Sequence, residues 1–392
     1  MKKLALVLAI ALIAAFYVTP VIASDFSAGG TYRFEAVSKD PGEAEKSDYF
    51  DQRMRVAFNW KVNDNVSAQI RTDISEAAWG DGYRPEQGTD TLMVDRAWVK
   101  INQGPLTLTV GQQYGMFGLE GTLWGDQFQG IQAAVDLKPF TLTLVYVKES
   151  EGGTDGNVLT DDGANDDTDT YGVSVGYAGD AFSGGLSFAT TVNGADDTDL
   201  SGLGLHFSIP VANFAINGEA NTYFGDDGAG ADYAGTQFWV ALDGKFSDSW
   251  SGGVTAIWAD DVDAGDTQVT NIVDDANFVM LDWAGALGYN NSPNPSCDIF
   301  DVSGNGKGVM GVVGDIKFAA SDALTLYAKL GYAEPNESDN LDSKIYALAN
   351  FDYAWMPAVT FSGGVGYIVP DYNSDANDDA LLTLTVQLGV SF

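Results

Sequence analysis

The last twelve residues, Leu381–Phe392 (LLTLTVQLGVSF), alternate between apolar and polar side chains. Neighbouring side chains of a β-strand point to opposite faces, so one face of this segment is apolar and the other is polar. The apolar positions are Leu382, Leu384, Val386, Leu388, Val390 and Phe392. The stretch predicts a strand whose apolar face meets either membrane lipid or the core of a soluble β-sandwich, since both produce this alternation.

The start of the chain has the pattern of a secretory signal peptide. Two lysines precede an apolar run from Leu4 to Val18, and a small-residue motif ending in Ala23 follows it. We expect residues 1–23 to be removed, which leaves residues 24–392 as the mature domain. An inner-membrane anchor is disfavoured because the run is shorter than the roughly 20 apolar residues of a spanning helix and has no basic residues on its far side.

The composition excludes several classes of protein. The 392 residues include 55 acidic and 19 basic side chains, a formal net charge of −36. We expect no nucleic-acid partner, because phosphates need basic side chains. An aromatic content of 12% and a hydrophobic content of 45% argue against disorder. The single cysteine, Cys297, cannot form an intrachain disulfide, so a closed, fully hydrogen-bonded sheet is the expected source of stability.

Segments with a two-residue period recur along the whole mature chain. In one of the clearest, Met54 and Val56 alternate with Arg53 and Arg55, and the segment ends at the tight turn Asn63-Asp64-Asn65. Short turns alternate with long polar loops, which is typical of transmembrane β-barrels with short periplasmic turns and long extracellular loops. We predict an all-β antiparallel transmembrane barrel of about 18 strands, with 16 as the alternative, and a water-filled lumen.

One stretch breaks this rhythm. Residues 260–307 are acidic and rich in asparagine and proline around a more apolar piece, and we expect a single long extracellular loop there. Asp301–Lys307 begins like a calcium-binding loop, but the twelfth position is Val312 instead of the glutamate that supplies a bidentate ligand. We therefore expect no bound metal and no cofactor.

All six arginines lie in the first quarter of the chain. They are Arg33, Arg53, Arg55, Arg71, Arg84 and Arg96. Alternation places four of them on the polar faces of three consecutive strands, and it places Arg96 and Lys100 on one face of the fourth. Stacked across neighbouring strands, these side chains form a cationic patch on one wall of the lumen. The alternative interpretation is charge pairing that satisfies buried strands. The carboxylates available for such pairing are Glu35, Asp51, Asp73 and Asp95.

A loop expected over residues 115–127 carries Glu120 and Asp126. With its signal peptide, alternating strands, early arginines, acidic third loop and terminal Phe392, the chain resembles the general porins of Gram-negative outer membranes. It is most similar to the homotrimeric porins of delta-type anaerobic bacteria. The resemblance implies that the third loop folds into the barrel, that its acids face the arginines across the narrowest point, and that Phe392 is read by the barrel assembly machinery. The insertion at residues 260–307 and a count above 16 strands depart from the family pattern.

These observations predict a channel, not an enzyme. We expect a porin of the outer membrane, in contact with lipid and lipopolysaccharide, through which small hydrophilic solutes and ions diffuse passively. A homotrimer is implied by the resemblance. The excess of acids predicts a modest cation preference, although the arginine wall attracts anions locally. Two alternatives remain: a barrel hydrolase that uses His206, for which no catalytic motif is present, and a surface binding or structural barrel without conductance.

Overall fold

The computed structural model describes residues 25–40, 47–78, 92–150, 167–194, 198–261, 263, 266–269, 308–336, 341–372 and 380–392. The expected signal peptide, Arg84, the calcium-like motif at residues 301–307 and most of the expected 260–307 loop lie outside these ranges. Within the described ranges, no helix is long and apolar enough to span a membrane. The regular structure consists of β-strands.

The strands are long and follow one another closely. Their bounds are β1 Asp25–Asp40, β2 Ser47–Lys61, β3 Val66–Ala78, β4 Leu92–Gln103, β5 Leu106–Phe117, β6 Trp124–Leu137, β7 Phe140–Ser150, β8 Thr168–Ala178, β9 Ser183–Asn193, β10 Thr198–Val211, β11 Phe214–Asp226, β12 Asp232–Lys245, β13 Trp250–Ala259, β14 Thr267–Gln268, β15 Val309–Ala319, β16 Leu324–Glu334, β17 Leu341–Met356, β18 Val359–Tyr372 and β19 Leu381–Ser391. Apart from the two-residue β14, each has at least the roughly 9–11 residues that a tilted strand needs to cross a bilayer.

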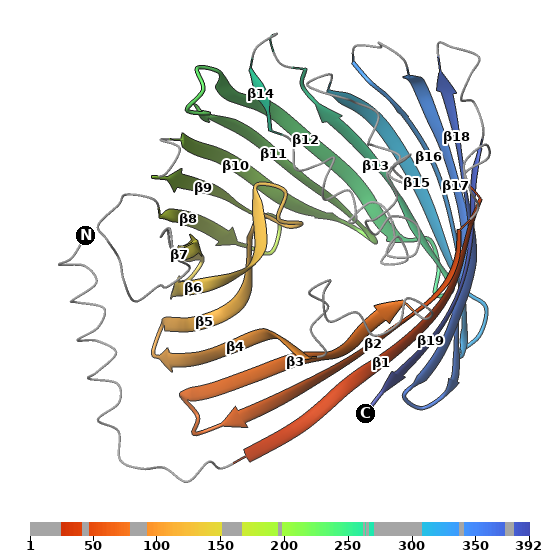
Figure 1. Cartoon of the computed structure of the whole chain (residues 1–392), viewed down its shortest axis with the longest axis horizontal. Helices are drawn as coiled ribbons and strands as arrows, with labels where there is room; N and C mark the ends of the chain where they lie inside the picture. The colour runs from red at the N-terminus through yellow and green to blue at the C-terminus, as the bar shows by residue number, and fades with distance from the viewer. Residues whose placement is uncertain are drawn as a thin grey trace, which may run out of the picture.

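Eighteen of these strands form one closed antiparallel barrel (Figure 1). Neighbours in sequence are neighbours in the wall, with β13 beside β15, and β1 pairs with β19 to close the ring. The short β14 pairs in parallel with the start of β12, within the segment expected as a single loop. The prediction of an antiparallel barrel of about 18 strands is confirmed, and the alternative of 16 strands is wrong.

Both ends of the described chain lie at the rim that carries the short turns. The N–H of Phe392 donates to the carbonyl of Gly30 at 3.0 Å, and the N–H of Gly30 donates back at 2.8 Å. Connections at this rim include the short turns at residues 62–65 and 104–105. The even number of wall strands therefore returns the chain to the rim from which it started, as the sequence predicts.

The C-terminal strand shows how the wall separates two environments. Leu384 is 49% exposed on the outer face, whereas Thr383 and Thr385 are 1% and 3% exposed on the inner face. Aromatic rings gather towards both rims: Trp250 stacks on Phe318 beside a short turn, with centroids 4.3 Å apart, and Phe238 stacks on Trp258 towards the opposite rim. An apolar exterior flanked by aromatic rings is typical of barrels embedded in lipid. Phe392 itself is 59% exposed at the short-turn rim.

The expected loop over residues 115–127 is wrong in its extent. β5 continues to Phe117 and β6 begins at Trp124, and these two residues pair, so that only residues 118–123 are loop. The strands extend further because the apolar side chains near the tip pack against the inner wall of the barrel. The connection between β5 and β6 is therefore a β-hairpin with a six-residue tip.

Candidate functional site

The β5–β6 hairpin leaves the wall at a pair of glycines. β4 pairs with β5 only as far as Ala97–Gln112, and β6 pairs with β7 only from Gly130–Val147 onwards. Gly111 and Gly130 face each other at this point. A Cβ on Gly111 would lie 2.2 Å from the carbonyl oxygen of Ala97, so only glycine permits this close approach. Beyond it, β5 and β6 pair only with each other and curve into the barrel (Figure 1).

Apolar side chains hold the hairpin against the inner face of the wall. Phe117, Leu123 and Phe128 of the hairpin are buried in one cluster. The wall contributes Val145, Val147, Ala189 and Tyr223 to the cluster. Wall glycines make room for the larger rings: Phe117 lies over Gly172 of β8. This packing holds the hairpin inside the lumen.

The fit of Phe117 over Gly172 gives a first testable prediction. A Cβ at Gly172 would lie 2.4 Å from the Phe117 ring, so Gly172→Val is expected to displace the ring and to destabilise the protein by about 1–3 kcal/mol, the usual effect of overpacking. Gly176→Val is the matched control, because it lies on the same face of β8 and a Cβ there would meet its nearest atom only at 4.0 Å. Urea unfolding of both variants measures the difference, and equal stabilities would contradict this packing.

Polar side chains of β11 and β12 hold the tip of the hairpin. Glu219 accepts hydrogen bonds from the N–H groups of Leu119 and Glu120 and from the hydroxyl of Thr122, at 2.7 Å for Glu120. The carbonyl oxygen of Thr122 accepts from the Tyr223 hydroxyl at 2.6 Å and from the Gln237 amide at 2.9 Å. The tip is therefore attached through main-chain groups as well as side chains.

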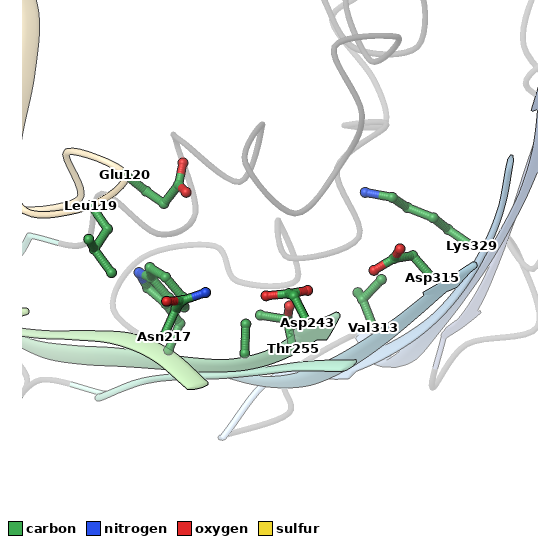
Figure 2. A pocket seen from close by; sticks show the side chains of 10 residues that line it. Leu119, Glu120, Asn217, Asp243, Thr255, Val313, Asp315 and Lys329 are labelled. Carbon is green, nitrogen blue, oxygen red and sulfur yellow. The ribbon is translucent and has the colours of Figure 1, made fainter. Parts of the chain in front are cut away.

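A cavity of about 300 Å³ lies between the tip and the wall from β11 to β16 (Figure 2). Its charged lining consists of Glu120 from the tip, Asp243 of β12, Asp315 of β15 and Lys329 of β16. Asp243 and Asp315 are both paired across strands with Gly253 of β13, so no side chain separates the two carboxylates. Lys329 is paired directly opposite Asp315. This side of the lumen, which we call the acidic pocket, carries three acids and one base among its lining residues.

Glu120 has an unusual environment at the tip. Burial raises the pKa of its carboxyl above the ordinary value of 4.5, and the nearby charges of Glu219 and Asp243 raise this pKa further. The charged form is therefore lost at a higher pH than for an ordinary glutamate. The electrostatic field of the acidic pocket weakens accordingly as the pH falls towards that pKa.

The arginines gather on a different part of the lumen wall, on β1 to β4. Arg33 is paired opposite Arg53, and Arg71 opposite Arg96. Thr31, on the same face of β1 as Arg33, is paired opposite Arg55. Facing side chains of an antiparallel pair lie on the same side of the sheet. The structure thus brings Arg33, Arg53, Arg55, Arg71 and Arg96 together on neighbouring strands, and we call these five side chains the arginine wall.

Buried acids partner two of these arginines. Arg55 donates from Nε and Nη2 to the two carboxylate oxygens of Asp73, at 2.5 and 2.7 Å. Arg71 donates from Nε to Asp95 at 2.7 Å, and the same carboxylate lies 3.5 Å from Nη2 of Arg55. The Asp73 side chain is only 4% exposed, whereas that of Arg55 is 23% exposed. A solute in the lumen therefore meets the guanidinium groups before the carboxylates.

Lys100 extends the arginine wall, and Arg33 within the wall has an acidic neighbour. Arg33 Nε lies 3.4 Å from Glu35, and the ammonium of Lys100 lies 5.1 Å from the centre of the Trp98 ring, within cation–π range. Lys100 is on the same face of β4 as Arg96. The two residues are four positions apart in a part of β4 that pairs regularly with β3, and every second side chain of a strand points to the same face. The side chain of Asp51 lies outside what the structure describes.

The two acids of the β5–β6 connection have different positions. Glu120 lies in the acidic pocket, and the charges that act on it are those of Glu219 and Asp243 rather than those of the arginines. Asp126 is exposed on β6, where its carboxylate accepts from the N–H of Gln127 at 2.5 Å. Their expected place across from the arginine wall stays a prediction.

Sequence reasoning did not single out Glu219, Asp243, Asp315 and Lys329. Each is a charged residue on the polar face of an alternating segment, which is an available signal for a lumen position. Among the described residues, no group of three or more His, Cys, Asp or Glu side chains is placed to hold a metal ion.

Comparison with solved structures places this barrel among known ones. It is similar to OccK11 (OpdR) of Pseudomonas aeruginosa, with a TM-score of 0.60 and 12% identity over 94% of this chain and 96% of that chain. It is also similar to a BenF-like porin of Pseudomonas fluorescens Pf-5, with a TM-score of 0.60 and 12% identity over 94% and 98% of the two chains. No protein-family model matches the chain, and no curated protein matches its sequence.

These similarities are similarities of fold. The architecture is that of the outer-membrane porins, and the apolar exterior agrees with a location in the outer membrane. Both of these structures come from Pseudomonas, and the expected similarity to porins of delta-type anaerobic bacteria stays a prediction.

Proposed function

We propose that this chain is an outer-membrane porin: a water-filled channel for passive diffusion of small hydrophilic solutes and ions, with a modest cation preference. The observation that carries this proposal is the inward hairpin, which lies inside an 18-stranded barrel and borders a cavity of about 300 Å³ with a charged lining. Barrels of this width leave an aqueous channel, and charged linings at a narrow point select among ions. The acidic pocket and the net charge of −36 favour cations.

The alternative of a barrel hydrolase has less support. His206 lies on the lumen face of β10, paired opposite Glu219. The carboxylate of Glu219 already accepts three hydrogen bonds from the hairpin tip, which accounts for its position without a role in orienting the histidine. A serine–histidine–acid arrangement needs the acid for that role. A passive channel is therefore the better interpretation, and no catalytic activity is proposed.

Three further elements belong to this proposal. We propose a homotrimer, contact of the apolar exterior with lipid and of the outer rim with lipopolysaccharide, and a role for Phe392 in recognition by the barrel assembly machinery. The position of Phe392 at the short-turn rim, 59% exposed, is compatible with that recognition. These elements rest on the resemblance to general porins.

The proposal predicts discrete conductance steps from the refolded mature chain in planar bilayers. In asymmetric KCl, the reversal potential should have the sign of cation preference, because acids outnumber bases. Liposome swelling with neutral sugars and with glucuronate then compares solute classes, since the similar OccK2 (OpdF) of Pseudomonas aeruginosa was solved in complex with glucuronate. A folded protein that conducts no ions would show that the barrel is a binding or structural protein instead.

A further inference from the structure

One buried carboxylate receives three donors from the hairpin tip. Glu219 is 2% exposed, and its oxygens accept from two consecutive main-chain N–H groups, those of Leu119 and Glu120, and from the Thr122 hydroxyl. A buried carboxylate is stable only when such donors satisfy it. The tip and the wall therefore stabilise each other at this point.

The sequence of the tip fits this contact. Gly118 has a φ of +94°, and a Cβ at this position would lie 2.3 Å from the nearer carboxylate oxygen of Glu219. A larger residue would therefore prevent the carboxylate from reaching the next two N–H groups. The glycine, the two amides and the threonine hydroxyl form one small receptor for a carboxylate.

We propose that Glu219 is a positioning residue that sets the width of the channel by holding the hairpin tip in place. It acts through Leu119 and Glu120. The main-chain N–H groups of these two residues donate to Glu219, and both residues line the acidic pocket. The apolar cluster at Phe117, Leu123 and Phe128 holds the end of the hairpin against the wall, but apolar contacts place no directional constraint on the tip. This inference rests on the proposed channel function.

The first test measures the contact itself, independently of transport. In the refolded full chain, the amide hydrogens of Leu119 and Glu120 are expected to exchange at least about tenfold faster in Glu219→Ala than in the unmodified protein, because a hydrogen bond to a charged group is worth more than that factor. Glu219→Gln, which keeps an oxygen acceptor, should give a smaller acceleration. Unchanged exchange at both amides would overturn the proposal.

The second test measures the channel. Glu219→Ala is expected to raise the single-channel conductance and to admit larger polyethylene glycols than the unmodified protein. Asp352→Asn is the matched control. It neutralises another carboxylate of the inner wall, which accepts a hydrogen bond at 2.7 Å from the hydroxyl of Ser362 on β18. This control should leave the polymer size limit unchanged. A size limit in Glu219→Ala equal to that of the unmodified protein would overturn the positioning role.

The tests also cover a variant that does not fold and an unmodified protein that does not conduct. If Glu219→Ala does not fold, Thr122→Val removes one donor from the hairpin side and leaves β11 intact, and faster exchange at Leu119 and Glu120 is again expected. Unchanged exchange in that variant would count against the proposal. If the unmodified protein does not conduct, the channel function fails, while amide exchange still decides whether Glu219 holds the tip.

Discussion

Replacing Arg55 with alanine is expected to lower the free energy of unfolding by about 2–4 kcal/mol, between the values typical of exposed and of fully buried ion pairs. The reason is that Asp73 would keep its charge in a buried position without its bidentate partner. Asp95 would also lose the second guanidinium group that lies 3.5 Å away. Urea unfolding in detergent micelles, followed by tryptophan fluorescence, measures the change.

Two further variants provide the comparison for Arg55→Ala. The double variant Arg55→Ala/Asp73→Ala should recover a large part of the loss, because no charge is then left without a partner. Lys61→Ala removes an exposed pair, in which Lys61 lies 2.9 Å from Asp64, and should cost less than about 1 kcal/mol. An Arg55→Ala protein as stable as Lys61→Ala would show that the arginine wall contributes no stability through pairing.

Neutralising the acidic pocket is expected to reverse the ion preference of the channel. With Glu120→Gln, Asp243→Asn and Asp315→Asn combined, the arginine wall becomes the dominant charged surface beside the hairpin. The reversal potential in asymmetric KCl should then shift towards, and past, the value of an unselective pore. Charges act over about 10 Å at 0.1 M salt, so groups at the narrow point outweigh distant ones.

The control changes the same number of charges elsewhere. Asp64, Asp248 and Asp322 lie in short turns at the rim, and their replacement by asparagine should leave the sign of the reversal potential unchanged. If both triple variants shift the potential equally, the overall charge of the protein, and not the acidic pocket, determines ion preference.

The strands of the barrel wall were predictable from the sequence because the alternation of apolar and polar residues is a local pattern. Alternation in Leu381–Phe392 tells which side chains face lipid, and the structure confirms it at Thr383 and Leu384. The same parity places the predicted arginines and Lys100 on one face, without knowledge of which strands pair. Strand boundaries were less predictable near loops, because the extension of β5 and β6 depends on packing inside the barrel.

The sequence also contains a signal for the inward hairpin, which the alternation of apolar and polar residues alone does not explain. Leu108 and Val110 occupy the outer face of β5, but the next positions on that face are Gln112 and Tyr114. Polar residues on a lipid-facing row indicate that the strand has left the wall. The change coincides with Gly111, where the hairpin turns inwards.

The acidic pocket depends on relations that one sequence does not contain. Asp243 and Asp315 are 72 positions apart and come together because both pair with Gly253. The register of three strands and the omission of β14 from the wall decide this. Glu219 meets the tip of the hairpin for a similar reason, since the hairpin enters the lumen and reaches the inner face of β11.

Residues 113–128 pair only among themselves, so the segment proposed to set the pore is separate from the rows that meet lipid. Insertions or substitutions at the tip can alter what passes through the protein while the hydrophobic belt stays the same. A family of channels of differing calibre can therefore be built on one membrane scaffold by changing six tip residues, 118–123, and the surfaces they touch.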